Sequence, residues 1–216
     1  VHIDFSHAKL RACVYEAIPA FKLSEYHKKV ADMLSGQYSP KKWDPALSSM
    51  LCYHYTKAGL SENVLNQHLC EMIFDITLNH DLFPLIQDDV LFSCTHPYND
   101  RSDTEKKMEA MSRLLSDIRN NMRADNEKEI LRMEASYLEL CGGYLVCWGE
   151  YARARVLLNR SMKIAREHSF STIYIHSLSN MGHYFLQTDN AEPLMRTARE
   201  MLNAARDDER EKYMGI

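Results

Sequence analysis

The sequence predicts an all-α fold made of helical hairpins, for three reasons. First, only 7 glycines and 6 prolines occur in 216 residues. This is about half the usual share of these turn-forming residues, and it favours long helices over sandwiches and barrels. Second, apolar residues recur at intervals of three and four along most of the chain, which is the spacing of an amphipathic helix. Third, residues typical of helix starts and stops separate these stretches, so we expect about ten helices.

The first part of the chain contains clear start and stop signals. Ser24 and Ser61 precede apolar periodic stretches and are suitable N-caps for them, because a serine hydroxyl can accept from a free backbone N–H of the first turn. Gly36 and Gly59 follow such stretches and are expected helix stops. The alternation of residues 1–5 predicts a short strand ahead of these helices.

A polar segment that contains a proline, residues 96–102, is the expected linker between two sets of helices. It separates one set within residues 21–95 from a second set within residues 102–216. The second set opens with Ser102-Asp103-Thr104-Glu105, which has the pattern of a capping box.

Four helices are expected in this second set, each with one apolar face. Gly149 is the expected stop between the second and the third of them. Their apolar residues, in chain order, are Met111, Leu114, Leu115, Ile118 and Met122; Ile130, Met133, Tyr137, Leu140, Cys141, Tyr144, Leu145 and Trp148; Ala154, Leu157, Leu158, Met162, Ile164 and Ala165; and Ile173, Leu178, Met181 and Phe185.

Composition excludes several functional classes. With 45% apolar and 26% charged residues, the chain is not disordered overall. Its net charge of −4 gives no broad basic field, so we expect no nucleic-acid partner. No apolar run reaches the roughly 18 residues of a membrane span, and the first residues, Val1-His2-Ile3-Asp4, have the pattern of neither a signal peptide nor a normal start. We therefore expect a cytoplasmic protein with no membrane contact, and a fragment of something longer.

Metal binding and catalysis are not expected. The six cysteines form no C-x-x-C pair and the ten histidines are scattered, so buried reduced thiols are favoured over a zinc site. The sequence contains no G-x-S-x-G, no H-E-x-x-H and no G-x-x-x-x-G-K-[ST] motif. We expect no enzyme activity, no metal and no cofactor in this chain.

A repeat relates the hairpins of the second set. Gly142 and Gly182 are 40 residues apart, and Leu138 and Leu178 precede them by four residues each. This pattern resembles the tetratricopeptide repeat (TPR), in which a small residue lets the two helices of a hairpin approach closely and neighbouring hairpins stack into a superhelix. The period exceeds the usual 34 or so, which implies longer helices. Two unrelated hairpins that align by chance remain the alternative.

The N-terminal stretch carries a second resemblance. The order Phe5-x-His7, Leu10-Arg11 and Val14-Tyr15-Glu16, continued by Tyr53 to Gly59, resembles the junction between the winged helix and the TPR-like region of STAND-type signalling ATPases. Such regions occur in bacterial regulators of the LuxR and maltose-activator kind and beside some adenylyl cyclases. The resemblance implies that residues 1–20 end a winged-helix or arm segment.

The same resemblance places ATP or ADP in an upstream domain of a longer protein. It implies that His7 senses the β-phosphate of that nucleotide, because an imidazole can donate N–H bonds to an anion. The alternative is that His7 simply packs at the end of a strand.

A binding groove follows by position from the TPR resemblance, in which the first helix of each hairpin lines the concave side. The first clear repeat contributes Glu139, with Ser136, Gly143, Val146 and Cys147 beside it. The second contributes His176, Ser179, Asn180, His183 and Gln187, and a less certain upstream repeat adds Tyr53, Thr56 and Lys57. The basic partners of a carboxylate clamp are missing.

Two functions remain open at this point. One is the sensor region of a STAND-type regulator, which binds an inducer or a protein partner and biases a nucleotide-dependent switch in transcription or signalling. The alternative is a free-standing TPR adaptor that holds peptide segments of protein partners.

Overall fold

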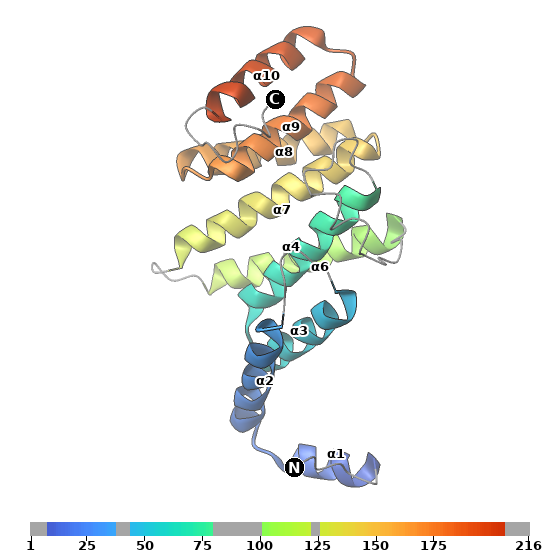
Figure 1. Ribbon diagram of the computed structural model, residues 1–216, viewed down its shortest axis with the longest axis vertical. Coiled ribbons are helices and arrows are strands. Elements are labelled where there is room, and N and C mark those ends of the chain that lie inside the picture. Colours follow the sequence, from blue (N-terminus) through green and yellow to red (C-terminus); the bar gives the residue numbers. More distant parts are fainter. Residues whose placement is uncertain (1–7, 38–43, 80–100, 122–125, 206–216) are drawn as a thin grey trace. The chain divides into compact units, whose positions relative to one another are not determined.

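The computed structural model describes residues 8–37, 44–79, 101–121 and 126–205, and these residues form helices and no strand. The prediction of an all-α fold of helical hairpins is therefore confirmed. The described residues contain nine helices, where about ten were expected for the whole chain: α1 (Ala8–Ala17), α2 (Ala20–Ser35), α3 (Pro45–Ala58), α4 (Ser61–Asn79), α6 (Arg101–Asn120), α7 (Glu127–Cys147), α8 (Tyr151–Glu167), α9 (Ser171–Gln187) and α10 (Ala191–Ala205) (Figure 1). The predicted strand at residues 1–5 and His7 lie outside the described residues.

The chain divides into two compact units, residues 1–64 and 65–216. The boundary lies within α4 instead of at the predicted linker 96–102, most of which lies outside the described residues. The reason is that Leu65, Leu69 and Met72 of α4 are buried in one apolar core with residues of α6, α7 and α8.

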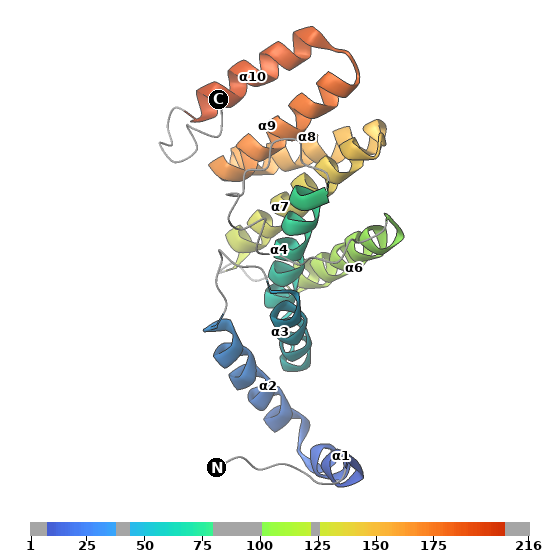
Figure 2. The same ribbon diagram turned by 45° about the vertical axis from the view of Figure 1, so that its right-hand side comes forward.

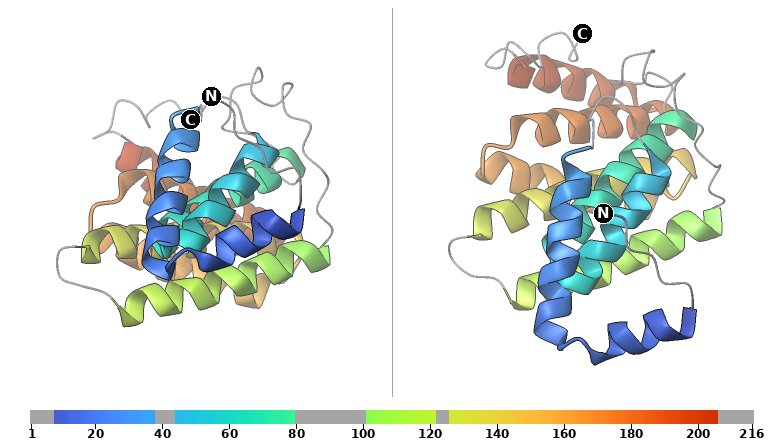
Figure 3. Two further views of the ribbon diagram at one scale, coloured as in Figure 1. Left: turned by 90° about the horizontal axis from the view of Figure 1, so that it is seen from below. Right: turned by 60° about the horizontal axis from the view of Figure 1, so that its bottom comes forward.

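In the first unit, α2 and α3 form an antiparallel hairpin (Figure 3). Asp44 caps α3: its Oδ1 accepts from the backbone N–H groups of Ala46 and Leu47 at 3.0 and 3.1 Å, the usual role of an aspartate N-cap. The prediction that Ser24 is an N-cap was wrong, because α2 already begins at Ala20. Ser24 lies inside the helix, and its hydroxyl donates to the Ala58 carbonyl of α3 at 3.0 Å.

In the second unit, α7, α8, α9 and α10 follow one another as stacked antiparallel helices, and α6 packs on α7 (Figure 2). The Glu134 side chain of α7 links this helix to α6 and α8. Its carboxylate, on a side chain that is only 3% exposed, accepts from Arg119 of α6 at 3.0 Å and from Arg160 of α8. The prediction that Ser102 is the N-cap of a capping box was wrong, since α6 already starts at Arg101 and Ser102 lies inside the helix.

One connector geometry recurs at three turns of this unit. Gly149, Ser169 and Asp189 lie 20 residues apart and all have a positive φ, of 73°, 58° and 54°. After each, the next backbone N–H donates to the carbonyl five residues earlier, at 2.8–2.9 Å, the hydrogen bond of a Schellman motif. The first unit uses the same turn at Gly59, where φ is 72°. The two units between these turns, which hold α8 and α9, therefore have 20 residues each.

The two repeat glycines differ in how closely the partner helix approaches. A Cβ added at Gly142 would lie 2.6 Å from Cγ of Leu158 on α8, whereas one at Gly182 would lie 3.7 Å from Cδ1 of Leu194 on α10. Gly142 thus lies where the paired helices touch, as predicted. The contact at Gly182 has only ordinary van der Waals spacing.

Candidate functional site

Two of the predicted groove residues join α7 to α9. Nδ2 of Asn180 donates to Oε1 of Glu139 at 2.6 Å, and the Glu139 side chain is buried. Asn180 fits there because residue 143 is glycine: an added Cβ would lie 2.8 Å from Nδ2 of Asn180. The expectation that these groups line an open groove was therefore wrong for Glu139, and Val146 is likewise a core residue.

The other predicted residues of α9 are accessible. Gln187 is exposed, and His176, Ser179 and His183 are half-buried. They recur at intervals of three and four, which places them on one face of the helix. The structure thus brings a hydroxyl, imidazoles and an amide together on α9, at the edge of the Glu139–Asn180 contact.

Tyr53 and Lys57 belong to the first unit. The Lys57 ammonium lies 5.9 Å from the centre of the Tyr53 ring, and that ring meets His27 of α2 edge-on with 5.6 Å between ring centres. His27 is buried and shares a hydrogen bond with His54. Sequence reasoning missed these two histidines, because their pairing depends on the register of α2 against α3.

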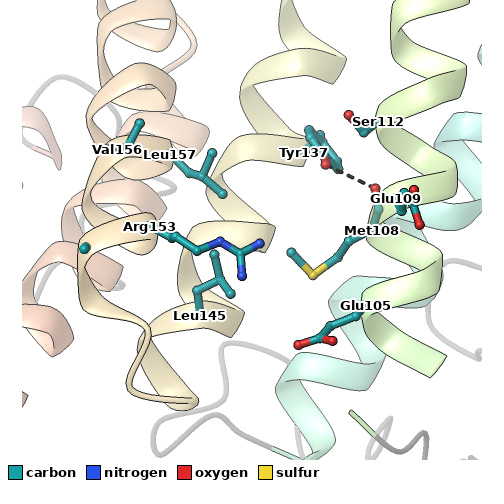
Figure 4. A pocket seen from close by; sticks show the side chains of 10 residues that line it. Glu105, Met108, Glu109, Ser112, Tyr137, Leu145, Arg153, Val156 and Leu157 are labelled. Atoms are coloured by element: carbon teal, nitrogen blue, oxygen red, sulfur yellow. Dashed lines mark hydrogen bonds between the residues drawn. The ribbon is translucent and has the colours of Figure 1, made fainter. Parts of the chain in front are cut away.

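A pocket of about 690 Å³ lies between α6, α7 and α8 of the second unit (Figure 4). Its apolar lining includes Met108 of α6, Leu145 of α7 and Leu157 of α8. The Tyr137 hydroxyl donates to the Met108 carbonyl at 3.1 Å, and burial, followed by the neighbouring Cys141, raises the pKa of Tyr137. The remaining lining residues are Glu105, Glu109, Ser112, Ala152, Arg153 and Val156.

Alternating charges connect the two sides of this pocket. Nε of Arg101 donates to Glu105 at 2.8 Å, and Arg101 also donates to Glu150. Arg153 donates to Glu150 at 2.6 Å, and the pKa of Glu150 is lowered, first by this bond and then by the other nearby guanidinium. Each lining carboxylate already has an arginine partner, since Glu109 accepts from Arg113. The pocket walls therefore favour neither a positively nor a negatively charged ligand.

The sequence contains a partial signal for this pocket. Glu105, Glu109 and Ser112 share one face of α6 at intervals of four and three, and Arg153 and Val156 are three residues apart on α8. The pattern shows two faces, but it does not show that the faces lie opposite each other across α7.

In the described part of the chain, no three histidine, cysteine, aspartate or glutamate side chains are grouped so that they could hold a metal ion. None of the helices described is long and apolar enough to cross a membrane. Of the described cysteines, Cys141 is buried as expected, but Cys13 and Cys147 are exposed.

Comparisons of the chain with protein-family models, with curated proteins and with solved structures give no match.

Proposed function

We propose that this chain is the sensor region of a STAND-type ATPase regulator and that it binds an inducer or a protein partner through the accessible face of α9. The observation that carries the proposal is the α7–α10 stack, in which α9 presents Ser179, His183 and Gln187 on one face. The resemblance of residues 5–59 to the STAND junction supports the regulator context.

The α9 face suits recognition for a physical reason. Hydroxyl, imidazole and amide groups both donate and accept hydrogen bonds, and the helix holds them at fixed spacing. The Asn180–Glu139 bond fixes α9 against α7, so the face is organised before a ligand arrives and less entropy is lost on binding.

Control of a switch requires a difference in affinity. A ligand that binds the open state of the full protein tenfold more tightly than the closed state shifts the equilibrium by about 1.4 kcal/mol. Equal affinity for both states shifts nothing, however tight the binding is. The proposal therefore demands that the ligand distinguish the ATP-bound from the ADP-bound protein.

The coding sequence on both sides of this chain tests the regulator context. A P-loop and a Walker B aspartate upstream of Val1 are expected, and a helix-turn-helix downstream would specify a transcription factor. An initiator methionine directly ahead of Val1, with no ATPase domain, would overturn the regulator proposal and favour the adaptor. In either case the chain by itself should neither hydrolyse ATP nor bind a fluorescent ADP analogue, because it has no phosphate loop.

Photocrosslinking in the full-length protein tests the binding face. A photoreactive amino acid at Ser179 should crosslink to the partner, and one at the exposed Asn159 of α8 should not. His183→Ala combined with Gln187→Ala should weaken the Ser179 crosslink and leave the helical circular-dichroism signal unchanged. Equal crosslinking from Asn159 would move the recognition surface away from α9.

A further inference from the structure

Three side chains of the first unit form a hydrogen-bonded chain across three helices. The Tyr15 hydroxyl of α1 lies 2.8 Å from Nε2 of His27 on α2, and Nδ1 of His27 lies 2.8 Å from Nδ1 of His54 on α3. His27 is only 7% exposed. Both nitrogens of a buried imidazole are thus engaged, and one of its partners is a second imidazole.

The groups around His27 disfavour its charged form. The pKa of His27 is lowered, first by burial, then by His54 and then by Lys57. The Tyr15 and Tyr53 rings meet the imidazole edge-on, with ring centres 6.1 and 5.6 Å away. Among the described residues, the titratable groups with a recorded contact or charge effect on His27 are Tyr15 from α1 and Tyr53, His54 and Lys57 from α3, and these four include no carboxylate.

The number of protons on the two imidazole rings determines whether the contact between them can persist. The Nδ1–Nδ1 hydrogen bond needs one proton between the two atoms, given by either ring. Nε2 of His27 can accept from the Tyr15 hydroxyl or donate to its oxygen, and Nε2 of His54 can be protonated or not. The pair keeps its bond with as many as three protons on its four nitrogens, that is, with a single positive charge.

A fourth proton is incompatible with this geometry. Both Nδ1 atoms would then carry hydrogen and would face each other as donors at 2.8 Å, with two like charges in contact. We propose that His27 and His54 form a proton-operated latch between α2 and α3, which is closed while the two rings share one Nδ1 proton and opens when both rings are protonated. This device is independent of the α9 binding face.

The latch joins α2 to α3, so its opening affects the contact between these two helices. Ser24 of α2 bonds Ala58 of α3, and His27 bonds His54, so both contacts follow the register of the same antiparallel pair. Loss of the histidine contact removes a side-chain link between the two helices and leaves one charged imidazole, that of His27, in a buried site. The expected response is local opening of the α2–α3 hairpin at mildly acidic pH.

Histidine ring NMR of the whole chain between pH 8 and 5 tests the latch, with amide hydrogen exchange measured alongside. His27 and His54 should titrate as a coupled pair in two steps. The second step should lie below the ordinary histidine pKa of about 6.5, because burial lowers the pKa of His27. Below that step, exchange in α2 and α3, corrected for its intrinsic pH dependence, should become at least about tenfold faster, while α8 should not change.

His54→Gln is the decisive variant. A glutamine amide both donates and accepts and carries no charge, so it can bond His27 Nδ1 in either protonation state. Acid should then no longer open the α2–α3 hairpin. His183→Gln, a matched change in the second unit, should leave the acid response as in the parent.

Two results would overturn the proposal. One is acid-induced opening of α2 and α3 that persists in His54→Gln. The other, which needs no variant, is independent single-step titration of the two histidines in the parent protein with unchanged exchange.

Discussion

Replacing Gly142 by alanine should destabilise the protein, although alanine is the better helix former. The added Cβ would lie 2.6 and 2.7 Å from Cγ and Cδ2 of Leu158 and 3.4 Å from its backbone nitrogen. Leu158 is fully buried, so its side chain has no free space into which it can turn. Overpacking of this kind costs about 1–3 kcal/mol, and the gain in helix propensity is about 1 kcal/mol. We therefore expect a net loss of about 1 kcal/mol.

Gly182→Ala is the matched control, because Gly182 occupies the equivalent position one hairpin later. Its added Cβ would lie 3.7 Å from Leu194, which is an ordinary contact. The higher helix propensity of alanine therefore dominates, and the free energy of unfolding should rise by up to about 1 kcal/mol. Urea unfolding followed by circular dichroism measures both variants, and an unchanged m-value shows that the folded state is comparable.

A double variant isolates the contact itself. Leu158→Ala should cost about 2–5 kcal/mol by itself. Combined with Gly142→Ala it should cost less than the two separate losses together, because the new methyl group occupies part of the vacated space. If Gly142→Ala stabilised the protein as much as Gly182→Ala does, the argument that this glycine sets the spacing of α7 and α8 would be refuted.

Three further predictions concern charges and turns. Glu134→Gln should lower the free energy of unfolding by about 1–2 kcal/mol, measured by urea titration, because the buried carboxylate loses charge-assisted bonds to two arginines. Ser169→Gly should raise it by about 1 kcal/mol, since serine is strained at a φ of 58°; no change would mean that the turn relaxes freely. Burial raises the pKa of Glu71, but His68 and Lys107 outweigh burial and hold it at about 2. The stability from this ionised group is present above pH 4.5 and is lost as the pH falls towards 2. Lys107→Met should reduce that loss in melting curves between pH 5 and 2, and an identical acid loss in this variant would contradict the assignment.

The fold was largely predictable because its helices are long and periodic and because glycine marks several turns. Gly59 and Gly149 were readable as stops, since a positive φ suits glycine. The same turn at Ser169 was less legible from residue type, because serine seldom adopts a positive φ. Ser24 shows the opposite error: a good N-cap residue inside a helix, where its hydroxyl bonds a neighbouring helix instead.

The candidate site was predictable only in part, for a geometric reason. Helical spacing correctly placed Ser179, His183 and Gln187 on one face of α9. The same spacing could not show that Asn180 reaches across Gly143 to Glu139, because that depends on how closely α7 and α9 approach. The pairing of His27 with His54 has no local sequence signal either, since it arises only when two helices lie in one particular register.

The two consecutive 20-residue units of the stack, which hold α8 and α9, have a mechanical consequence. Helices in such a linear array hold mainly their immediate neighbours, so a force applied to the C-terminal end should detach α10 first, then α9, then α8. Each unit of 20 residues between successive turns spans about 70 Å when its helix is unfolded and the chain is fully extended. Stretching should therefore lengthen the stack in steps of nearly equal size, and the array would behave as an extensible tether whose length records how many helices remain docked.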